Sequence, residues 1–148
     1  MRVLIVDDSR FIRQHLRQLL ESTGLSCEEA ADGSQALEVL RQSRGFDLML
    51  IDVNMPRMNG LECVKAVRDA GLHPLMKVMM VTTESDNSFI ARALAYGADE
   101  FLMKPFSPDS LREKLAMLEL AAGGETEPTR PGESSLLPAE SGATSGLL

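Results

Sequence analysis

Three uninterrupted apolar blocks constrain the fold of this chain more than any other feature. They occupy residues 3–6, 48–51 and 78–81. A strand with one solvated face alternates apolar and polar residues, whereas a strand covered on both faces is apolar throughout, as in the centre of a parallel sheet. Two more polar segments, residues 25–30 and 101–103, fit strands nearer the edges. The chain is therefore expected to form a five-stranded parallel sheet.

Amphipathic segments separate these expected strands, and they predict helices. In the fourth of them, the spacing predicts that Ile90, Ala91, Leu94 and Ala95 form the buried face. Five residues suit helix N-caps: Ser9, Asp32, Asn59, Asp86 and Ser107. Strands that alternate with helices predict a doubly wound α/β fold, with right-handed crossovers and helices on both faces of the sheet.

The composition of the chain changes at Gly123. Residues 1–122 carry the alternating pattern and are expected to form one domain, since 148 residues suit a single core. Of the last 26 residues, 15 are Gly, Pro, Ser or Thr, and the Leu residues there have no periodicity. Such a segment buries too little apolar surface to offset the entropy of ordering it. Residues 123–148 are therefore expected to be a flexible tail, and a docking role for Leu136 and Leu137 stays open.

Charge and cysteine content argue against several classes of protein. The chain has 15 Lys and Arg against 22 Asp and Glu, a net charge of −7 and no basic run, which disfavours nucleic-acid binding. The apolar blocks are too short for a signal peptide or a membrane span, so a cytoplasmic protein is expected. Cys27 and Cys63 lack metal-site spacing and are expected to be reduced. His15 and His73 are expected at the surface or at helix ends.

Polar side chains follow the ends of four expected strands. Asp7 and Asp8 come after the first strand, Asp52 after the third, Thr82 after the fourth and Lys104 after the fifth. In such sheets, ligands bind outside the carboxyl ends of the strands. Three carboxylates about 5 Å apart repel by roughly 3 kcal/mol a pair at a dielectric near 20, so they need a cation, and Mg²⁺ fits. With Lys104 and Thr82 added, the set describes phosphoryl transfer to an aspartate, for which Asp52 is the best acceptor.

Five segments contain these residues and form a specific pattern. They read LIVDDS at 4–9, LIDVNMPRMNG at 50–60, VTTE at 81–84, GAD at 97–99 and FLMKPF at 101–106. In this order and spacing, over residues 1–120, they resemble a response-regulator receiver domain of the CheY-like type, from two-component signalling. The resemblance implies a flavodoxin-like (βα)5 sheet with strand order 2-1-3-4-5.

The resemblance also implies roles for the acidic residues. Asp52 would accept a phosphoryl group from the phosphohistidine of a sensor histidine kinase or a histidine phosphotransfer protein. Mg²⁺ would be bound by Asp8, by Asp52 and by the backbone carbonyl of Asn54, with Asp7 acting mainly through water.

Lys104, Thr82 and Phe101 take their roles from the same resemblance. Lys104 and Thr82 would bind phosphoryl oxygens, and a cis peptide bond between Lys104 and Pro105 would aim the lysine into the site. When Asp52 is phosphorylated, Thr82 would move towards it and Phe101 would turn into the vacated space. Phe101 stands where many relatives carry Tyr, and its alternative role is plain core packing.

Asn54 and Glu84 lie two residues beyond the expected acceptor and the expected switch threonine. Receiver domains tune the hydrolysis of the aspartyl phosphate at these positions. Polar side chains there can orient an attacking water, so a short-lived phosphorylated state is expected, as in motility regulators.

Three classes of function follow from the sequence. In the first, a stand-alone response regulator binds a target protein through residues 86–118 when phosphorylated, in chemotaxis or in a phosphorelay. It would be a monomer or an activation-dependent dimer, and would catalyse only its own phosphotransfer and autodephosphorylation; no output domain follows residue 122. The second class, an Asp-nucleophile phosphohydrolase on a similar sheet, is disfavoured because a DxD signature after the first strand is absent. The third, a phosphorylation-independent scaffold, is disfavoured by the intact site.

Overall fold

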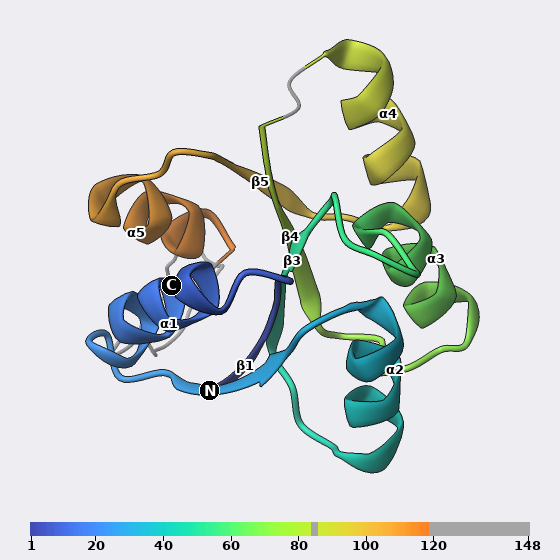
Figure 1. The fold of residues 1–148 in the computed structure, drawn as a ribbon, viewed down its shortest axis with the longest axis horizontal. Helices are drawn as coiled ribbons and strands as arrows, with labels where there is room; N and C mark the ends of the chain where they lie inside the picture. Colours follow the sequence, from blue (N-terminus) through green and yellow to red (C-terminus); the bar gives the residue numbers. More distant parts are fainter. Residues whose placement is uncertain (84–85, 119–148) are drawn as a thin grey trace, which may run out of the picture. The chain divides into compact units, whose positions relative to one another are not determined.

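A single parallel sheet forms the centre of the computed structural model, which describes residues 1–83 and 86–118 (Figure 1). Its strands are β1 (Arg2–Val6), β2 (Ser26–Ala30), β3 (Leu48–Asp52), β4 (Lys77–Thr82) and β5 (Glu100–Met103). They pair in the order β2-β1-β3-β4-β5, and every pair is parallel. The expected sheet and strand order are therefore confirmed.

Helices cover both faces of this sheet, as a doubly wound fold requires. They are α1 (Arg10–Glu21), α2 (Gly33–Gln42), α3 (Gly60–Asp69), α4 (Asn87–Tyr96) and α5 (Pro108–Met117). In Figure 1, α1 and α5 lie on one side of the sheet, and α2, α3 and α4 lie on the other. Each helix returns the chain to the amino-terminal edge of the sheet, so the carboxyl ends of all five strands share the opposite edge.

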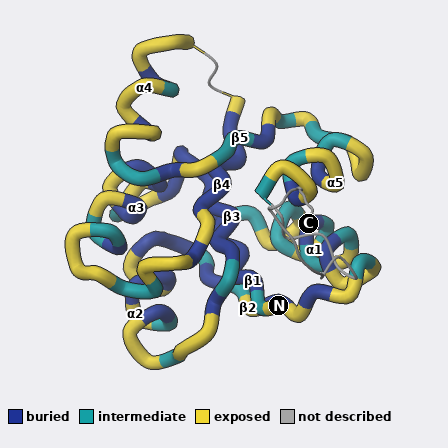
Figure 2. Tube along the Cα trace, turned by 180° about the vertical axis from the view of Figure 1, so that it is seen from behind, coloured by how far each residue is buried: buried dark blue, intermediate teal, exposed yellow. Residues whose placement is uncertain are grey.

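The three apolar blocks form the core, as their composition predicts. Every residue of 3–6, 48–51 and 78–81 is 1% exposed or less. Figure 2 shows these central strands as the most continuously buried part of the chain. The edge strand β2 instead mixes buried and more exposed residues, with Cys27 and Ala30 buried and Glu28 exposed. Burial on both faces explains why the interior of each central strand has no polar residue, although β1 begins at Arg2 and β4 at Lys77.

All five expected N-caps are confirmed. Each cap side chain accepts a hydrogen bond from the backbone N–H three residues later, which satisfies one donor that the helix leaves open. Losing such a cap costs about 1 kcal/mol. At its other end, α4 stops at Gly97, whose φ of 114° lies in the left-handed region that favours glycine.

The predicted buried face of α4 is wrong except at Ile90, which is half-buried against the core. The structure buries Phe89 and Ala93, whereas Ala91, Leu94 and Ala95 are exposed, Leu94 by 50%. The reason is tertiary: the ring of Phe89 packs edge-on against Phe101 of β5, with centroids 6.3 Å apart, and this sets the rotation of the helix. As a consequence, α4 presents apolar side chains to solvent.

Both cysteines match the expectation from the sequence that they are reduced. Cys27 and Cys63 are both free and buried, and burial raises their pKa values to about 11 and about 12, so both are protonated thiols at neutral pH.

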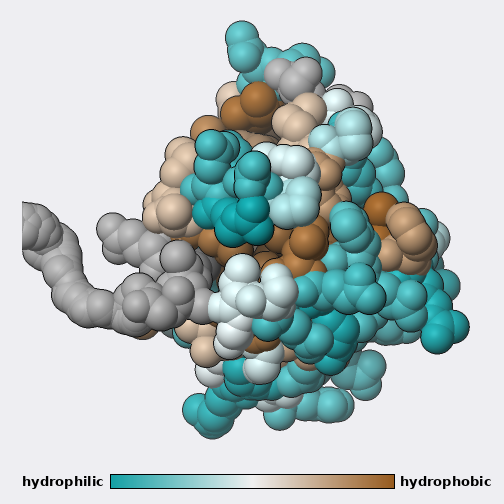
Figure 3. Space-filling view, turned by 90° about the vertical axis from the view of Figure 1, so that its left-hand side faces the viewer, coloured by the Kyte–Doolittle hydropathy of each residue, from teal (hydrophilic) through white to brown (hydrophobic). Residues whose placement is uncertain are grey.

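No helix within residues 1–83 and 86–118 is long and apolar enough to cross a membrane. Hydrophilic side chains predominate on the side of the molecule seen in Figure 3, with apolar ones between them.

Two sequence-based expectations fall on residues that the structure does not describe. Glu84 lies in the gap between residues 83 and 86, and the expected tail at 123–148 lies beyond Leu118.

Candidate functional site

The register of the sheet gathers the polar residues that follow the strands. Val6 of β1 lies opposite Ile51 of β3, so the residues that follow them, Asp7 and Asp52, are level with each other. Asp52 in turn lies opposite Val81 of β4. Thr82 lies opposite Met103, and Lys104 follows directly. Chemistry-bearing side chains from four strands therefore meet at one edge.

Asp7, Asp8, Asp52 and Lys104 form a tight cluster at this edge. One oxygen from each of the three carboxylates lies within 4.8 Å of the others. The Nζ of Lys104 donates to Oδ1 of Asp52 at 3.1 Å and to Oδ2 of Asp7 at 3.3 Å. Asp7 is 1% exposed and Asp52 is 7% exposed, whereas Asp8 is exposed. The cluster is therefore buried on one side and open to solvent through Asp8.

The loop after β1 holds one side-chain oxygen of Asp7, and Lys104 holds the other. Oδ1 accepts a hydrogen bond from the backbone N–H of Ser9 at 2.8 Å, while Oδ2 accepts from Lys104. Ser9 also caps α1, and Arg13 donates to the carbonyl of Asp7 at 2.7 Å. With both oxygens engaged, Asp7 is less available than Asp8 or Asp52 to contact a metal directly.

Lys104 is positioned by the backbone around it. Its N–H donates to the carbonyl of Thr82 at 2.9 Å, which continues the β4–β5 pairing by one residue. The peptide bond between Lys104 and Pro105 is cis, as the resemblance implied. From this point the side chain reaches Asp52 and Asp7 across the end of β3.

The charges of the cluster shift the pKa values of two of its members. Burial raises the pKa of Asp52, and the neighbouring charge of Asp7 raises it further, while the hydrogen bond from Lys104 offsets part of the effect. For Lys104, burial alone would lower the pKa, but the hydrogen bond to Asp52 and the charge of Asp7 outweigh it. The pKa of Lys104 is therefore raised, and its ammonium group stays charged.

The donor set fits a hard divalent cation. Three carboxylates face one ammonium group, so two negative charges are in excess when all are ionised. All candidate ligand atoms are oxygens, and one side of the cluster is open to water. Mg²⁺ binds through one or two carboxylates and keeps several waters, which matches this arrangement. The residues present therefore fit the metal that the sequence predicted.

The other predicted site residues that the structure describes lie on β4, on β5 and in the loop after β3. Thr82 ends β4 with 1% exposure, on the strand next to Asp52. Phe101 is half-buried on β5 and packs against Phe89. Asn54 lies in the loop after β3 and is exposed. Glu84 falls outside the described residues, so its place relative to the cluster stays a prediction.

Sequence reasoning missed one ion pair near the site. Asp32, expected only as the cap of α2, also accepts a hydrogen bond from the guanidinium of Arg57. Arg57 lies in the loop that follows Asp52. The two residues are 25 positions apart, and no local spacing signals their pairing.

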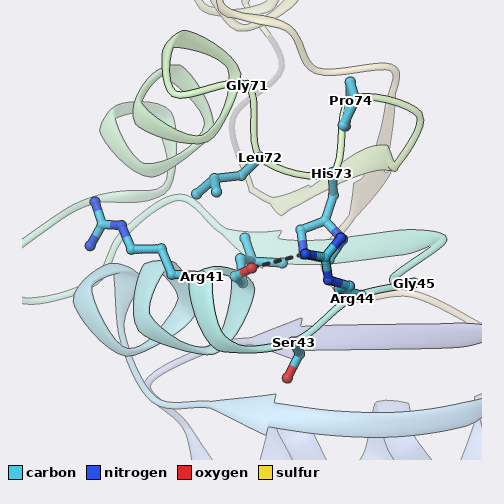
Figure 4. A pocket seen from close by; sticks show the side chains of 9 residues that line it. Arg41, Ser43, Arg44, Gly45, Gly71, Leu72, His73 and Pro74 are labelled. Carbon is cyan, nitrogen blue, oxygen red and sulfur yellow. Dashed lines mark hydrogen bonds between the residues drawn. The ribbon is translucent and has the colours of Figure 1, made fainter.

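A hollow of about 410 Å³ lies elsewhere, at the amino-terminal edge of the sheet. Its lining runs from the end of α2 to the loop before β4, and includes Arg41, Arg44 and His73 but no acidic residue. The Nε2 of His73 already contacts the carbonyl of Leu40 at 2.9 Å. In Figure 4, the guanidinium of Arg41 lies on one side of the hollow's lining residues, and the ring of His73 lies on the other. The hollow therefore does not gather its polar groups on one point.

The raised pKa of Asp52 predicts a stability effect that needs no phosphoryl donor. Its folded-state pKa lies above the ordinary value of about 3.9, so ionised Asp52 destabilises the metal-free fold, and protonation removes this cost as the pH falls through that pKa. Asp52→Asn is expected to raise the free energy of unfolding at neutral pH by on the order of 1 kcal/mol, because burial of the charged carboxylate and the neighbouring charge of Asp7 together outweigh the offset from Lys104. Urea unfolding of both proteins in EDTA, from neutral to acid pH, measures this difference.

The difference should shrink as the pH falls, because the wild-type carboxyl becomes neutral like the amide. Subtracting the two curves cancels the titration of the other carboxylates. A variant that is less stable than the wild type at neutral pH, or a difference independent of pH, would contradict this electrostatic description.

Comparisons with known proteins agree with this geometry. The family model described as response regulator receiver domain matches residues 3–116. A chemotaxis protein CheY homolog from Campylobacter jejuni is 36% identical over 126 residues, which span 84% of this chain and 97% of that protein. The structure of chemotaxis protein CheY4 from Vibrio cholerae has a TM-score of 0.74 at 41% identity, covering 78% of this chain and 96% of that one. A CheY-like receiver domain protein from Methanospirillum hungatei has a TM-score of 0.72 at 34% identity, covering 79% and 91%.

Proposed function

This chain belongs to the response regulator receiver domain family, and from that premise we propose that Asp52 is its phosphoryl acceptor. The observation that carries the proposal is the contact between Lys104 and Asp52, 3.1 Å long, inside a cluster of three carboxylates. Burial and the charge of Asp7 raise the pKa of Asp52, which makes its carboxylate oxygen more basic. Asp52 is also the one carboxylate of the three that ends a central strand.

The proposed reaction is a transfer from a phosphohistidine to Asp52. A carboxylate oxygen of Asp52 forms a bond to phosphorus as the bond between phosphorus and the histidine nitrogen breaks, and that nitrogen keeps the electron pair. The Nζ of Lys104, which contacts Asp52, would neutralise charge on a phosphoryl oxygen, and the hydroxyl of Thr82, at the end of the neighbouring strand, would donate to another. The donor is a sensor histidine kinase or a histidine phosphotransfer protein.

Mg²⁺ would be held by the side chains of Asp8 and Asp52 and by the backbone carbonyl of Asn54, with Asp7 acting through water. The engagement of both Asp7 oxygens by Ser9 and Lys104 supports this division of roles. When bound, the metal neutralises the carboxylates and the developing charge of the phosphoryl oxygens. The protein residues themselves align the acceptor oxygen and exclude water from its buried side.

The proposed output is binding of a target protein by the face formed by residues 86–118. Phosphorylation would draw Thr82 towards Asp52, and Phe101, on the neighbouring strand, would turn inward. The contact of Phe101 with Phe89 links this movement to α4. Leu94 is 50% exposed and Met103 is 41% exposed, so the face already offers apolar side chains to a partner.

We place this activity in the cytoplasm, in a signalling pathway of the chemotaxis or phosphorelay kind. The names of the relatives from Campylobacter jejuni and Vibrio cholerae support chemotaxis. The proposed domain covers residues 1–122, and the protein is a monomer or dimerises on activation. It would catalyse no reaction beyond its own phosphorylation and dephosphorylation.

Incubation with a small phosphodonor such as acetyl phosphate, with and without Mg²⁺, tests the function. We expect one phosphoryl group per chain by intact mass spectrometry, only when Mg²⁺ is present. Rapid, repeated turnover of a small phosphoester would instead favour the phosphohydrolase alternative.

The phosphorylated state is expected to last for minutes or less. Asn54 and Glu84 are polar residues at the positions where receiver domains tune hydrolysis, and they would orient a water for attack on the phosphorus. Loss of the phosphoryl mass after donor removal measures the half-life. The acid-denatured phosphoprotein is the matched control, because its acyl phosphate is not held in a site. A half-life of many hours in the folded protein, or equal rates in both samples, would contradict a tuned site.

A further inference from the structure

Asp32 is a buried carboxylate whose charge must be satisfied within the protein. Its side chain is 1% exposed. Oδ1 accepts a hydrogen bond from the backbone N–H of Gln35 at 2.9 Å, and Oδ2 accepts one from the guanidinium of Arg57. The N–H of Gln35 and then Arg57 lower the pKa of Asp32, so it is ionised at neutral pH. Arg57 is therefore the cation that balances this buried charge, and it belongs to another loop.

The backbone at Arg57 adopts a conformation that ordinary side chains disfavour. Its φ is 67°, in the left-handed region that suits glycine. The N–H of Met58 donates to the carbonyl of Pro56 at 2.8 Å, which closes a tight turn centred on Arg57. An i to i+2 turn with a positive φ at a non-glycine residue persists only when its surroundings stabilise it.

The loop that contains this turn is anchored at two further points. The N–H of Gly60 donates to the carbonyl of Val53 at 2.8 Å, and a Cβ at Gly60 would collide with the backbone of Asp52. A Cβ at Gly33, next to Asp32, would lie 3.0 Å from Met58. The loop after β3 is therefore packed against the loop that precedes α2.

Asn54 lies between these anchors, two residues after Asp52. A backbone carbonyl can serve as a metal ligand only if the chain around it keeps one conformation. Within residues 1–83 and 86–118, no side-chain hydrogen bond or ion pair of Asn54 fixes that conformation, so it depends on how the rest of the loop is held.

We propose that the Asp32–Arg57 ion pair is a positioning device that holds the loop after β3 in its metal-binding conformation. The inference rests on the proposed function, because it concerns the Asn54 carbonyl at the same site. The pair compensates for the unfavourable backbone at Arg57, and by doing so it presents that carbonyl to the metal. Neither residue touches the reacting atoms.

Arg57→Ala tests this through the affinity for Mg²⁺, measured by titration calorimetry without any phosphodonor. We expect binding about tenfold weaker, since the alanine retains the backbone cost of a left-handed residue but loses the pair. The sign of the change is decisive. Removal of a positive charge near a metal site would by itself strengthen Mg²⁺ binding, so unchanged or tighter binding in Arg57→Ala would overturn the proposal.

Two further variants separate the backbone effect from the charge effect. Arg57→Gly loses the pair but tolerates the positive φ, so its Mg²⁺ affinity is expected within about threefold of wild type. Asp32→Asn keeps an acceptor for the N–H of Gln35 but loses the charge that pairs with Arg57, and should resemble Arg57→Ala. When Asp32→Asn is added to Arg57→Gly, the Mg²⁺ affinity should change little further. An Arg57→Gly variant as weak as Arg57→Ala would overturn the role of the backbone.

Arg112→Ala is the matched control, because it also removes an exposed arginine paired with an aspartate, Asp109 on α5. Its Mg²⁺ affinity should equal that of the wild type. If the wild type itself binds no Mg²⁺, the proposed function fails first. Hydrogen exchange then tests the positioning role alone: the amides of Asn54, Met55 and Met58 should exchange faster in Arg57→Ala than in Arg57→Gly, and equal protection would overturn it.

Discussion

Asp52→Asn is expected to abolish phosphoryl incorporation from acetyl phosphate, with labelling reduced to background. The amide cannot provide the carboxylate oxygen that forms the bond to phosphorus, and no other described carboxylate shares its position beside Lys104 at the end of a central strand. Intact mass spectrometry after incubation with Mg²⁺ measures the loss. Because the same substitution is expected to stabilise the metal-free fold, unfolding would not explain a silent variant.

Asp109→Asn is the matched control for this experiment. Asp109 is an exposed carboxylate in the first turn of α5, paired only with its neighbour Arg112 among the described residues. It should label like the wild type. Labelling of Asp52→Asn at the wild-type level would show that another residue is the acceptor.

The second large effect is expected from Asp8→Asn, which should weaken Mg²⁺ binding by more than tenfold. Asp8 is the solvent-exposed member of the carboxylate cluster, and Lys104 contacts Asp7 and Asp52 instead. Its charge is therefore the one most available to an incoming cation. A tenfold loss corresponds to only about 1.4 kcal/mol, which is modest for a direct carboxylate ligand of a divalent ion.

Calorimetric titration with MgCl₂ measures this effect, and labelling at limiting Mg²⁺ should fall in parallel. At saturating Mg²⁺ much of the labelling should return, since Asp52 is intact. Asp109→Asn again serves as the control, because it also removes one negative charge, but from α5 and not from the carboxylate cluster. An Asp8→Asn variant with wild-type affinity would exclude Asp8 as a ligand.

Much of the fold was predictable because it depends on patterns that are local in sequence. The apolar run at residues 48–51 has no polar residue to place on a solvated face, so it had to lie in the centre of a parallel sheet. Ser9 and Asp32 cap helices through bonds to residues only three positions away. The gathering of Asp7 and Asp52 then follows from parallel strands ending at one edge.

Features that depend on contacts between distant elements were not predictable. The rotation of α4 is set by Phe89 packing on Phe101, which overrides the spacing of Ala91 and Leu94. The pairing of Asp32 with Arg57 joins two loops and depends on a left-handed residue that no sequence pattern marks. In both cases tertiary packing decides between local options of similar energy.

The side chains of the site are already in position, and its negative charge is already in excess, before any phosphoryl donor binds. Lys104 contacts two carboxylates, the loop after β1 fixes Asp7, and the cluster keeps an excess of negative charge for a cation. Asp52 is the residue on which every proposed step converges. Its modification is therefore the central claim.

Chemical trapping of the modified residue tests that claim most directly. Borohydride reduces an aspartyl phosphate to homoserine, with loss of the phosphate, whereas it leaves a free carboxylate or a phosphohistidine unchanged. The wild-type protein, labelled with acetyl phosphate and Mg²⁺ and then reduced and digested, is predicted to yield homoserine at position 52 alone. Homoserine at another aspartate, or none in a folded protein that carries the phosphoryl mass, would contradict the assignment of Asp52 as the acceptor.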